Sequence, residues 1–208
     1  MVVVSGAGGS FSAGLDRSML DPRDPGPDSI LSLLALDDAA LADVIDEYQQ
    51  GMCFLRDPRF VSVAAVQGHA IGAGFQLALS CDLRIASTDA RFCMKEAALG
   101  LVPDLTGTQP LVDCVGYARA LEICATARTI GAEEALTLGL VNQVVEPDRL
   151  DAAVDALVAA LTAPMPGVAR ELKPLLRAAT GRTLDEQRRF ERVAQVRRLR
   201  ELARALSA

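Results

Sequence analysis

The sequence predicts an α/β protein in which a parallel sheet is followed by a helical region. Short and nearly continuous apolar runs, typical of strands buried on both faces of a sheet, occur at Val2–Ser5, Ser62–Val66 and Leu83–Ala86. Stretches with helical spacing of apolar residues separate these runs, as expected for an α/β fold. From Pro110 onward strand signals fade, except at Val141–Val145, and helical patterns dominate.

The first half of the chain alternates strand and helix. After the first strand, Ser18–Asp38 is rich in Asp, Pro and Ser, which predicts a loop with room for one helical turn. Ala39–Leu55 then carries apolar residues at helical spacing and leads to the second strand. A short helix over Gly72–Ser80 separates the second strand from the third.

Five helices with an apolar face are predicted after Pro110. They cover Tyr117–Thr126, Ala132–Thr137, Arg149–Thr162, Gly167–Thr180 and Leu184–Leu206. The last one has apolar residues at steps of three and four, opposite eight arginines between Arg182 and Arg204. Such a basic amphipathic helix can contact a membrane or a partner, although an apolar face packed beneath solvated arginines is the commoner outcome.

The composition of the 208 residues fits one domain, with or without a helical appendage. No window approaches about 18 consecutive apolar residues and the chain does not start with a basic region, so we expect a soluble, cytoplasmic protein without a membrane span. Five cysteines without a CxxC pair, and a single histidine, predict reduced thiols and no metal site. The formal net charge of −6 argues against a nucleic-acid partner.

Two glycine-bearing turns are the most informative feature of the chain. Phe11–Asp16 follows the first strand, His69–Gln76 follows the second, and each leads into helix-like sequence. Glycines at such crossings let backbone N–H groups point outward, and the start of a helix adds partial positive charge. Together, two such turns can hold one developing oxyanion. Taken singly, each is an ordinary strand-to-helix turn.

Neither turn fits a nucleotide-binding loop. Gly6-Ala7-Gly8 would begin a dinucleotide fingerprint, but Phe11 stands where a small residue is required. Gly9 and Gly14 have the spacing of a phosphate loop, yet Leu15-Asp16 replaces the residues that would bind phosphate and magnesium. Both nucleotide interpretations therefore fail at their most discriminating position.

Several motifs accompany the second turn at characteristic spacing. They are Ser62–Ala86, Ala90-Arg91-Phe92, Glu96, Leu99–Pro103, Gly107-Thr108-Gln109, Ala132–Leu136 and Gly139–Asn142. In order and approximate spacing, this set resembles the crotonase, or enoyl-CoA hydratase/isomerase, superfamily. The resemblance implies a crotonase-like (ClpP/crotonase) fold, which is a spiral of ββα units with a C-terminal helical region.

The resemblance also implies two regions in the chain. Residues 1–109 would form the crotonase core, and residues 110–208 the helical region that in this family builds the trimer and helps to close the acyl-CoA site. Family members usually carry a further β-αβ unit before the strand that Val2–Ser5 matches, so we expect the chain to lack that unit. We expect a homotrimer or homohexamer that binds an acyl-CoA substrate.

In the family, two backbone N–H groups bind the thioester oxygen, and their positions map onto Leu15 and Ala73. Removing a proton next to a thioester, or adding water to a conjugated double bond, passes through an enolate that such donors stabilise. The substrate contacts implied by the resemblance are Ala13, Gly14, Asp16, Arg17, Gly72, Gly74 and Gln76. Arg17 is a candidate for a CoA phosphate and equally an ordinary solvated arginine. No cofactor is expected beyond the CoA of the substrate.

The carboxylates decide the reaction. Family hydratases use two glutamates, whose positions correspond here to Gln76 and Glu96. A glutamine can position water but cannot exchange a proton near neutral pH. The dienoyl-CoA isomerase branch pairs a glutamate at the Glu96 position with an aspartate at that of Asp104. Asp104 is therefore a candidate catalytic carboxylate, with a loop cap beside Thr106 as the alternative.

Three functions follow from this pattern. The first is double-bond isomerisation of an enoyl- or dienoyl-CoA, with Glu96 and Asp104 as the catalytic pair. The second is hydration, with Glu96 moving the proton and Gln76 holding the water. The third is binding of acyl-CoA without catalysis. Decay of a catalytic site would remove carboxylates rather than add Asp104, so isomerisation is favoured.

Overall fold

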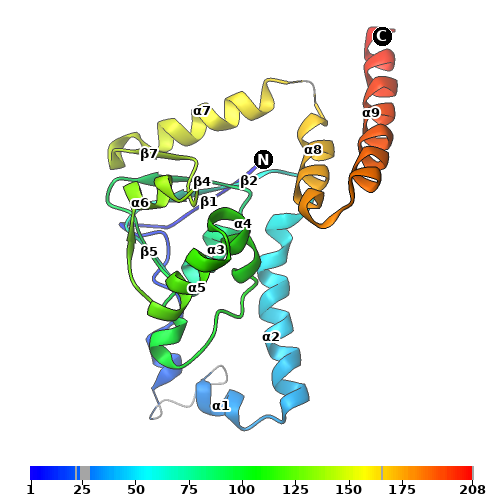
Figure 1. Ribbon diagram of the computed structural model, residues 1–208. Helices are drawn as coiled ribbons and strands as arrows, with labels where there is room; N and C mark the ends of the chain where they lie inside the picture. Colours follow the sequence, from blue (N-terminus) through cyan, green and yellow to red (C-terminus); the bar gives the residue numbers. More distant parts are fainter. Residues whose placement is uncertain (22, 24–28, 165, 208) are drawn as a thin grey trace.

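A four-stranded parallel sheet forms the centre of the protein, in the order β1-β2-β4-β7. Its strands are β1 (Val2–Ser5), β2 (Ser62–Val66), β4 (Leu83–Ser87) and β7 (Gln143–Val145). The computed structural model (Figure 1) describes residues 1–207 apart from 22, 24–28 and 165, and the side chains of Arg17 and Leu20 lie outside this description. The predicted α/β class with a parallel sheet and a helical C-terminal part is confirmed.

Strand β2 is buried on both faces, as its continuous apolar run predicts. Ala64 and Val66 belong to the larger core cluster. Val63 and Ala65 belong to a second cluster with Leu150 and Val154 of α7 (Leu150–Thr162). Figure 1 shows α7 on one side of the sheet and α3 (Ala73–Ser80) on the other.

A second, smaller sheet positions the glycine turns. It consists of β3 (His69–Ile71), β5 (Arg91–Cys93) and β6 (Ile130–Gly131), with β3 and β5 parallel and β6 antiparallel to β5. The sequence patterns do not predict these strands, because two or three residues are too few to show a period of two. Gly72 follows β3 directly, and α3 begins at the next residue.

The remaining helices lie around or beside these sheets. They are α1 (Ile30–Leu34), α2 (Asp38–Cys53), α4 (Thr108–Val115), α5 (Tyr117–Thr126), α6 (Ala132–Thr137), α8 (Val168–Arg177) and α9 (Leu184–Leu206), with 3₁₀ turns η1 (Arg17–Leu20), η2 (Phe54–Arg56), η3 (Glu96–Leu99), η4 (Pro147–Arg149) and η5 (Ala179–Gly181). Two of these elements, η1 and α1, fall in or overlap the predicted loop Ser18–Asp38, which thus holds more helix than expected. Ser29 accounts for the start of α1, since its hydroxyl accepts the N–H of Ser32 at 3.2 Å.

Helix α3 is fixed at its C-terminal end by Arg84. The buried guanidinium donates to the carbonyl groups of Ala78 at 3.2 Å, Cys81 at 2.7 Å and Leu140 at 2.6 Å. The Cys81 carbonyl lies just after the last turn of α3, where a helix leaves carbonyl groups without partners within the helix. Arg84 therefore joins the C-terminal end of α3 to the segment around Leu140.

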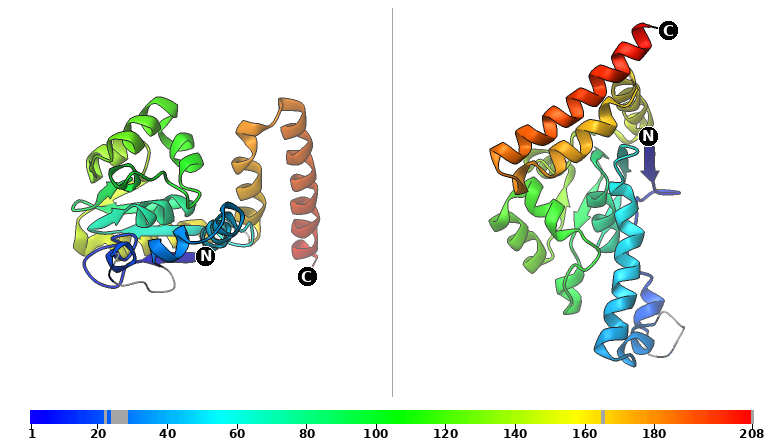
Figure 2. Two further views of the ribbon diagram at one scale, coloured as in Figure 1. Left: turned by 90° about the horizontal axis from the view of Figure 1, so that it is seen from below. Right: turned by 90° about the vertical axis from the view of Figure 1, so that its right-hand side faces the viewer.

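The C-terminal helices α8 and α9 form a pair beside the α/β body (Figures 1 and 2). Buried Lys173 ties α8 to the body, since its Nζ lies 2.8 Å from Asp82 Oδ2 and donates to the carbonyl groups of Leu55 and Phe60. In α9 only Ala194 is buried. Within a single chain, the predicted apolar face of this helix is therefore exposed rather than packed. No helix in the described ranges is long and apolar enough to cross a membrane.

Candidate active site

The two glycine turns lie against each other. Ser12, in the first turn, forms a parallel bridge with Ala70 of β3 and accepts the N–H of Ile71 at 3.0 Å on its carbonyl oxygen. Gly74 lets α3 approach closely, since a Cβ there would lie 2.5 Å from that same Ser12 oxygen. The first turn is thus bonded to the strand that leads into the second.

Backbone conformation sets the direction of the N–H groups in both turns. Gly14 has φ +89° and Gly72 has φ +52°, values that residues with a Cβ rarely adopt. A Cβ on Gly14 would lie 2.5 Å from the Ile71 carbonyl oxygen and 3.6 Å from the Ala73 nitrogen. Among the described residues, none accepts a hydrogen bond from the N–H of Leu15 or of Ala73. Both predicted oxyanion donors are therefore free of acceptors from the described residues.

Glu96 stands beside the second turn because β3 and β5 are parallel neighbours. Their register pairs Ile71 with Cys93, so the turn after β3 and the 3₁₀ helix after β5 begin at the same sheet edge. Glu96 Oε1 would lie 3.3 Å from a Cβ on Gly72. Glu96 is buried, and its Oε2 is a buried oxygen without a hydrogen-bond partner in the described part of the chain.

Gln76 joins Glu96 to the loop before α4. This side chain is fully buried; its amide nitrogen donates to Glu96 Oε1 at 2.8 Å. Its Oε1 accepts the N–H of Leu105 at 2.8 Å and that of Gly107 at 3.2 Å. These two donors fix the orientation of the amide, because a flipped amide would set N–H against N–H. Both acceptor sites of the Gln76 oxygen are thus in use.

The loop that carries Asp104 is also held from α2 and η2. Gln49 donates to the Asp104 carbonyl at 2.7 Å, and Arg56 donates to the Thr106 carbonyl at 2.9 Å. Thr106 has φ +65°, a strained value for a β-branched residue. Its hydroxyl is buried and, within the described residues, has no partner.

The carboxyl group of Asp104 stays apart from this network. No hydrogen bond or ion pair joins it to Glu96 or to any other described residue. Asp104 as a whole is exposed, but nearby protein atoms partly desolvate its carboxyl and raise its pKa above the ordinary value, an effect that its own N–H partly offsets. Its catalytic pairing with Glu96 stays a prediction.

The remaining predicted contacts lie in the first turn. Ala13 is exposed there, next to Gly14. Asp16 caps η1, since its Oδ1 accepts the N–H and the hydroxyl of Ser18, both at 2.9 Å, and these bonds lower the pKa of its carboxyl. The side chain of Arg17 lies outside the described residues. The described part of the chain holds no cluster of three His, Cys, Asp or Glu side chains suited to a metal ion.

The two interlocked turns, with a buried glutamate beside them, are of the kind found in the crotonase superfamily, and the mixed α/β fold agrees. The chain belongs to the enoyl-CoA hydratase/isomerase family, whose sequence profile matches residues 1–203.

Similar proteins carry related names. A short-chain-enoyl-CoA hydratase of Clostridium acetobutylicum is 51% identical over 88 residues, which are 42% of this chain and 34% of that enzyme. A probable enoyl-CoA hydratase of Rhizobium meliloti is 35% identical over 92% of this chain and 68% of its own length. The match to the first relative thus spans only about a third of that enzyme's length.

Solved structures agree over nearly the whole chain. A putative enoyl-CoA hydratase from Thermobifida fusca YX in complex with CoA superposes with a TM-score of 0.89 and 54% identity, over 98% of this chain and 77% of that one. A structure of a putative enoyl-CoA hydratase from the same organism in complex with acetoacetyl-CoA superposes with a TM-score of 0.89 and 56% identity, over 96% of this chain and 78% of that one.

Sequence reasoning missed the contacts made by Ser12 and by the backbone of Leu105 and Gly107. Ser12 gave no signal, because its bridge to Ala70 is made by the main chain. Gly107 did carry a sequence signal, because it is a glycine directly before a helix. A Cβ at Gly107 would lie 2.6 Å from Gln76 Cγ, which explains why a glycine stands there.

Proposed function

We propose that the protein acts on acyl-CoA thioesters and moves a carbon–carbon double bond in an enoyl- or dienoyl-CoA. The N–H groups of Leu15 and Ala73 hold the thioester oxygen, and Glu96 carries the proton. This chemistry needs no cofactor beyond the CoA of the substrate. A cytoplasmic location is part of the proposal, and the free thiols of the five cysteines are compatible with it.

One observation carries the proposal: Oε2 of buried Glu96, beside the two turns, has no hydrogen-bond partner among the residues that the structure describes. A buried carboxylate oxygen without a partner is costly, unless a ligand supplies the missing contact. A C–H group next to a thioester, made acidic by the oxyanion donors, is such a ligand. Moving a double bond needs one proton carrier, and the glutamine at position 76 supports this reaction over two-glutamate hydration.

Hydration is the alternative, favoured by the names of the relatives. In that reaction Glu96 alone would transfer the proton and Gln76 would contact the water. Binding of acyl-CoA without turnover is the third candidate, and the retention of a buried glutamate at position 96 argues against it.

The test is incubation of the purified protein with 2-enoyl-, 3-enoyl- and dienoyl-CoA, with the products separated by mass and absorbance. We expect conversion of the 3-enoyl- or dienoyl-CoA without a change of mass, whereas hydration adds one water. In Asp104→Asn, a loss of about tenfold or more confined to the dienoyl substrate would support a catalytic role for this carboxyl group. If this variant has wild-type activity on all three substrates, Asp104 has no catalytic role and the loop-cap alternative holds.

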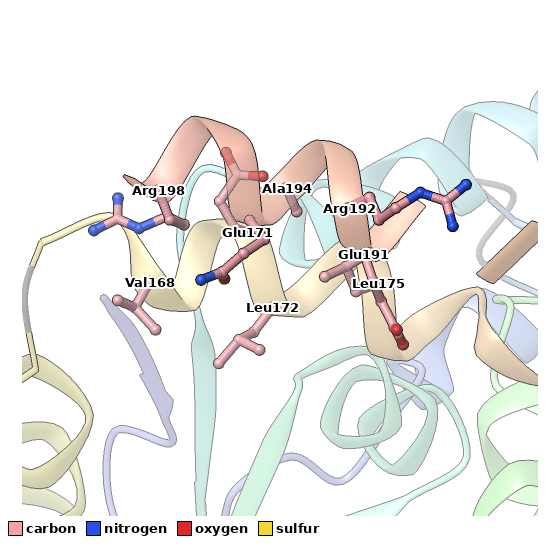
Figure 3. Close-up of a pocket in the computed structure, with 9 residues that line it drawn as sticks. Val168, Glu171, Leu172, Leu175, Glu191, Arg192, Ala194 and Arg198 are labelled. Carbon is pink, nitrogen blue, oxygen red and sulfur yellow. The ribbon is translucent and has the colours of Figure 1, made fainter. Parts of the chain in front are cut away.

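We also propose that the protein assembles as a homotrimer, or a dimer of trimers, through α8 and α9. Phe190, Val193, Val196 and Leu199 of α9 are about half exposed in the single chain. Between the helices lies a groove of about 520 Å³, with apolar walls that include Leu172 and with charged residues along it (Figure 3). Exposed apolar surface of this kind is typical of subunit contacts.

Sedimentation velocity at micromolar concentration measures this assembly. We expect a trimer or hexamer, and Leu199→Arg should shift it toward the monomer by placing a charge in the apolar face. A wild-type protein that sediments as a stable monomer would contradict the proposal.

A further inference from the structure

We infer that Gln76 is a positioning residue, which assigns proton transfer to one oxygen of Glu96 and thereby favours isomerisation over hydration. The inference rests on the proposed function, since it concerns the proton that Glu96 carries. Its evidence is the set of hydrogen bonds around the Gln76 amide.

The first step concerns the two oxygens of Glu96. Gln76 Nε2 donates to Oε1 at 2.8 Å, and the Gln76 amide cannot flip without losing the bonds from Leu105 and Gly107. A proton on Oε1 would therefore face an N–H, donor against donor. Protonated Glu96 must carry its proton on Oε2, the buried oxygen that accepts no hydrogen bond from the described residues.

One oxygen is sufficient to move a double bond. Oε2 takes a proton from C2 of a 3-enoyl thioester, and the electron pair of that C–H bond delocalises onto the thioester oxygen. The same proton then goes from Oε2 to C4, while the C2–C3 double bond forms and the C3–C4 double bond is lost. The product is an isomer of the substrate, so no oxidant, reductant or water is consumed.

Hydration requires more than this arrangement offers. A second group must accept a hydrogen bond from the attacking water while Glu96 handles the other proton. Both acceptor sites of Gln76 Oε1 are occupied by Leu105 and Gly107. Gln76 keeps one N–H that can donate to a water, but it has nothing with which to accept the proton.

Gln76 also holds the loop around Leu105 and Gly107. Thr106, between the two N–H donors, has φ +65° and a buried hydroxyl without a described partner. A loop strained in this way depends on the bonds that fix its ends. Gly107 packs closely on Gln76, since a Cβ there would lie 2.6 Å from Gln76 Cγ.

The experiment compares Gln76→Glu and Gln76→Met with wild type, and uses Gln143→Glu, on the exposed edge of β7, as a control for added charge. Isomerisation of a 3-enoyl-CoA and hydration of a 2-enoyl-CoA are measured as kcat and KM across pH. Hydrogen exchange at the amides of Leu105 and Gly107 reports the loop without any dependence on activity.

In Gln76→Glu the loop bonds persist, and two carboxyl groups next to each other share one proton. We expect the ratio of hydration to isomerisation to rise about tenfold or more, and the pH profile to become bell-shaped. In Gln76→Met we expect faster exchange at Leu105 and Gly107 and a fall in kcat of about tenfold for isomerisation, without gain of hydration. Gln143→Glu should match wild type.

A ratio and pH profile in Gln76→Glu equal to those of wild type would overturn the inference and leave the proposed function standing. If Gln76→Glu does not fold, an unchanged kcat for isomerisation in Gln76→Met would overturn the inference instead. A change of ratio in Gln143→Glu as large as that in Gln76→Glu would also overturn it, because charge alone would then be responsible. Wild-type protein that hydrates but does not isomerise would overturn the proposed function itself.

Discussion

Replacing Glu96 with glutamine should lower the turnover number about 10²–10⁴-fold and leave the affinity for acetoacetyl-CoA almost unchanged. The substitution keeps the shape of the side chain, and its oxygen can still accept the N–H of Gln76 in place of Oε1. The atom at the position of Oε2 becomes an N–H donor, which cannot take a proton from carbon. Steady-state kinetics and calorimetric titration measure the two effects separately.

The matched control is Glu133→Gln, which removes the same charge from an exposed position on α6. This variant should keep wild-type kinetics. Full activity in Glu96→Gln would exclude Glu96 as the proton carrier. A loss of affinity as large as the loss of turnover would instead give Glu96 a role in binding.

Helical spacing of apolar residues and continuous apolar runs predicted several elements with their exact bounds. The bounds of α5, α6 and α9 are those expected from their helical spacing, and β1 and β2 coincide with their apolar runs. The strands β3 and β5 could not be predicted in this way, although they place Gly72 and Glu96 together. Each has three residues, and their pairing depends on contacts between distant parts of the chain.

The candidate site was predictable where a residue acts through its own chemistry. The glycine turns were predicted from residue type and spacing, and Glu96 from the resemblance to the crotonase superfamily. That both acceptor sites of Gln76 Oε1 are occupied could not be predicted, because the donors are backbone N–H groups 29 and 31 residues away. Asp16 was predicted from its place in the turn as a substrate contact, which stays a prediction; the structure adds that its hydrogen bonds with Ser18 cap η1.

The second large effect is expected at Gly14. Gly14→Ala should lower turnover about 10²–10³-fold, the loss typical of removing one oxyanion donor. The added Cβ would lie 2.5 Å from the Ile71 carbonyl oxygen, and φ +89° is strained for alanine. Relief of this clash moves the first turn away from the second, so the N–H groups of Leu15 and Ala73 can no longer reach one oxygen. Single-turnover kinetics with a 3-enoyl-CoA measures the chemical step directly.

Gly139→Ala is the matched control for this experiment, because it has φ +77° but its added Cβ would meet its nearest atom at an ordinary 3.6 Å. Both variants therefore carry backbone strain and should melt at lower temperatures than wild type, whereas Gly14→Ala alone should lose the chemical step. Equal losses of turnover in the two variants would attribute the effect to stability. Wild-type turnover in Gly14→Ala, with the protein folded, would rule out an oxyanion site built from these two turns, since donors displaced by the clash could not then be required for the reaction.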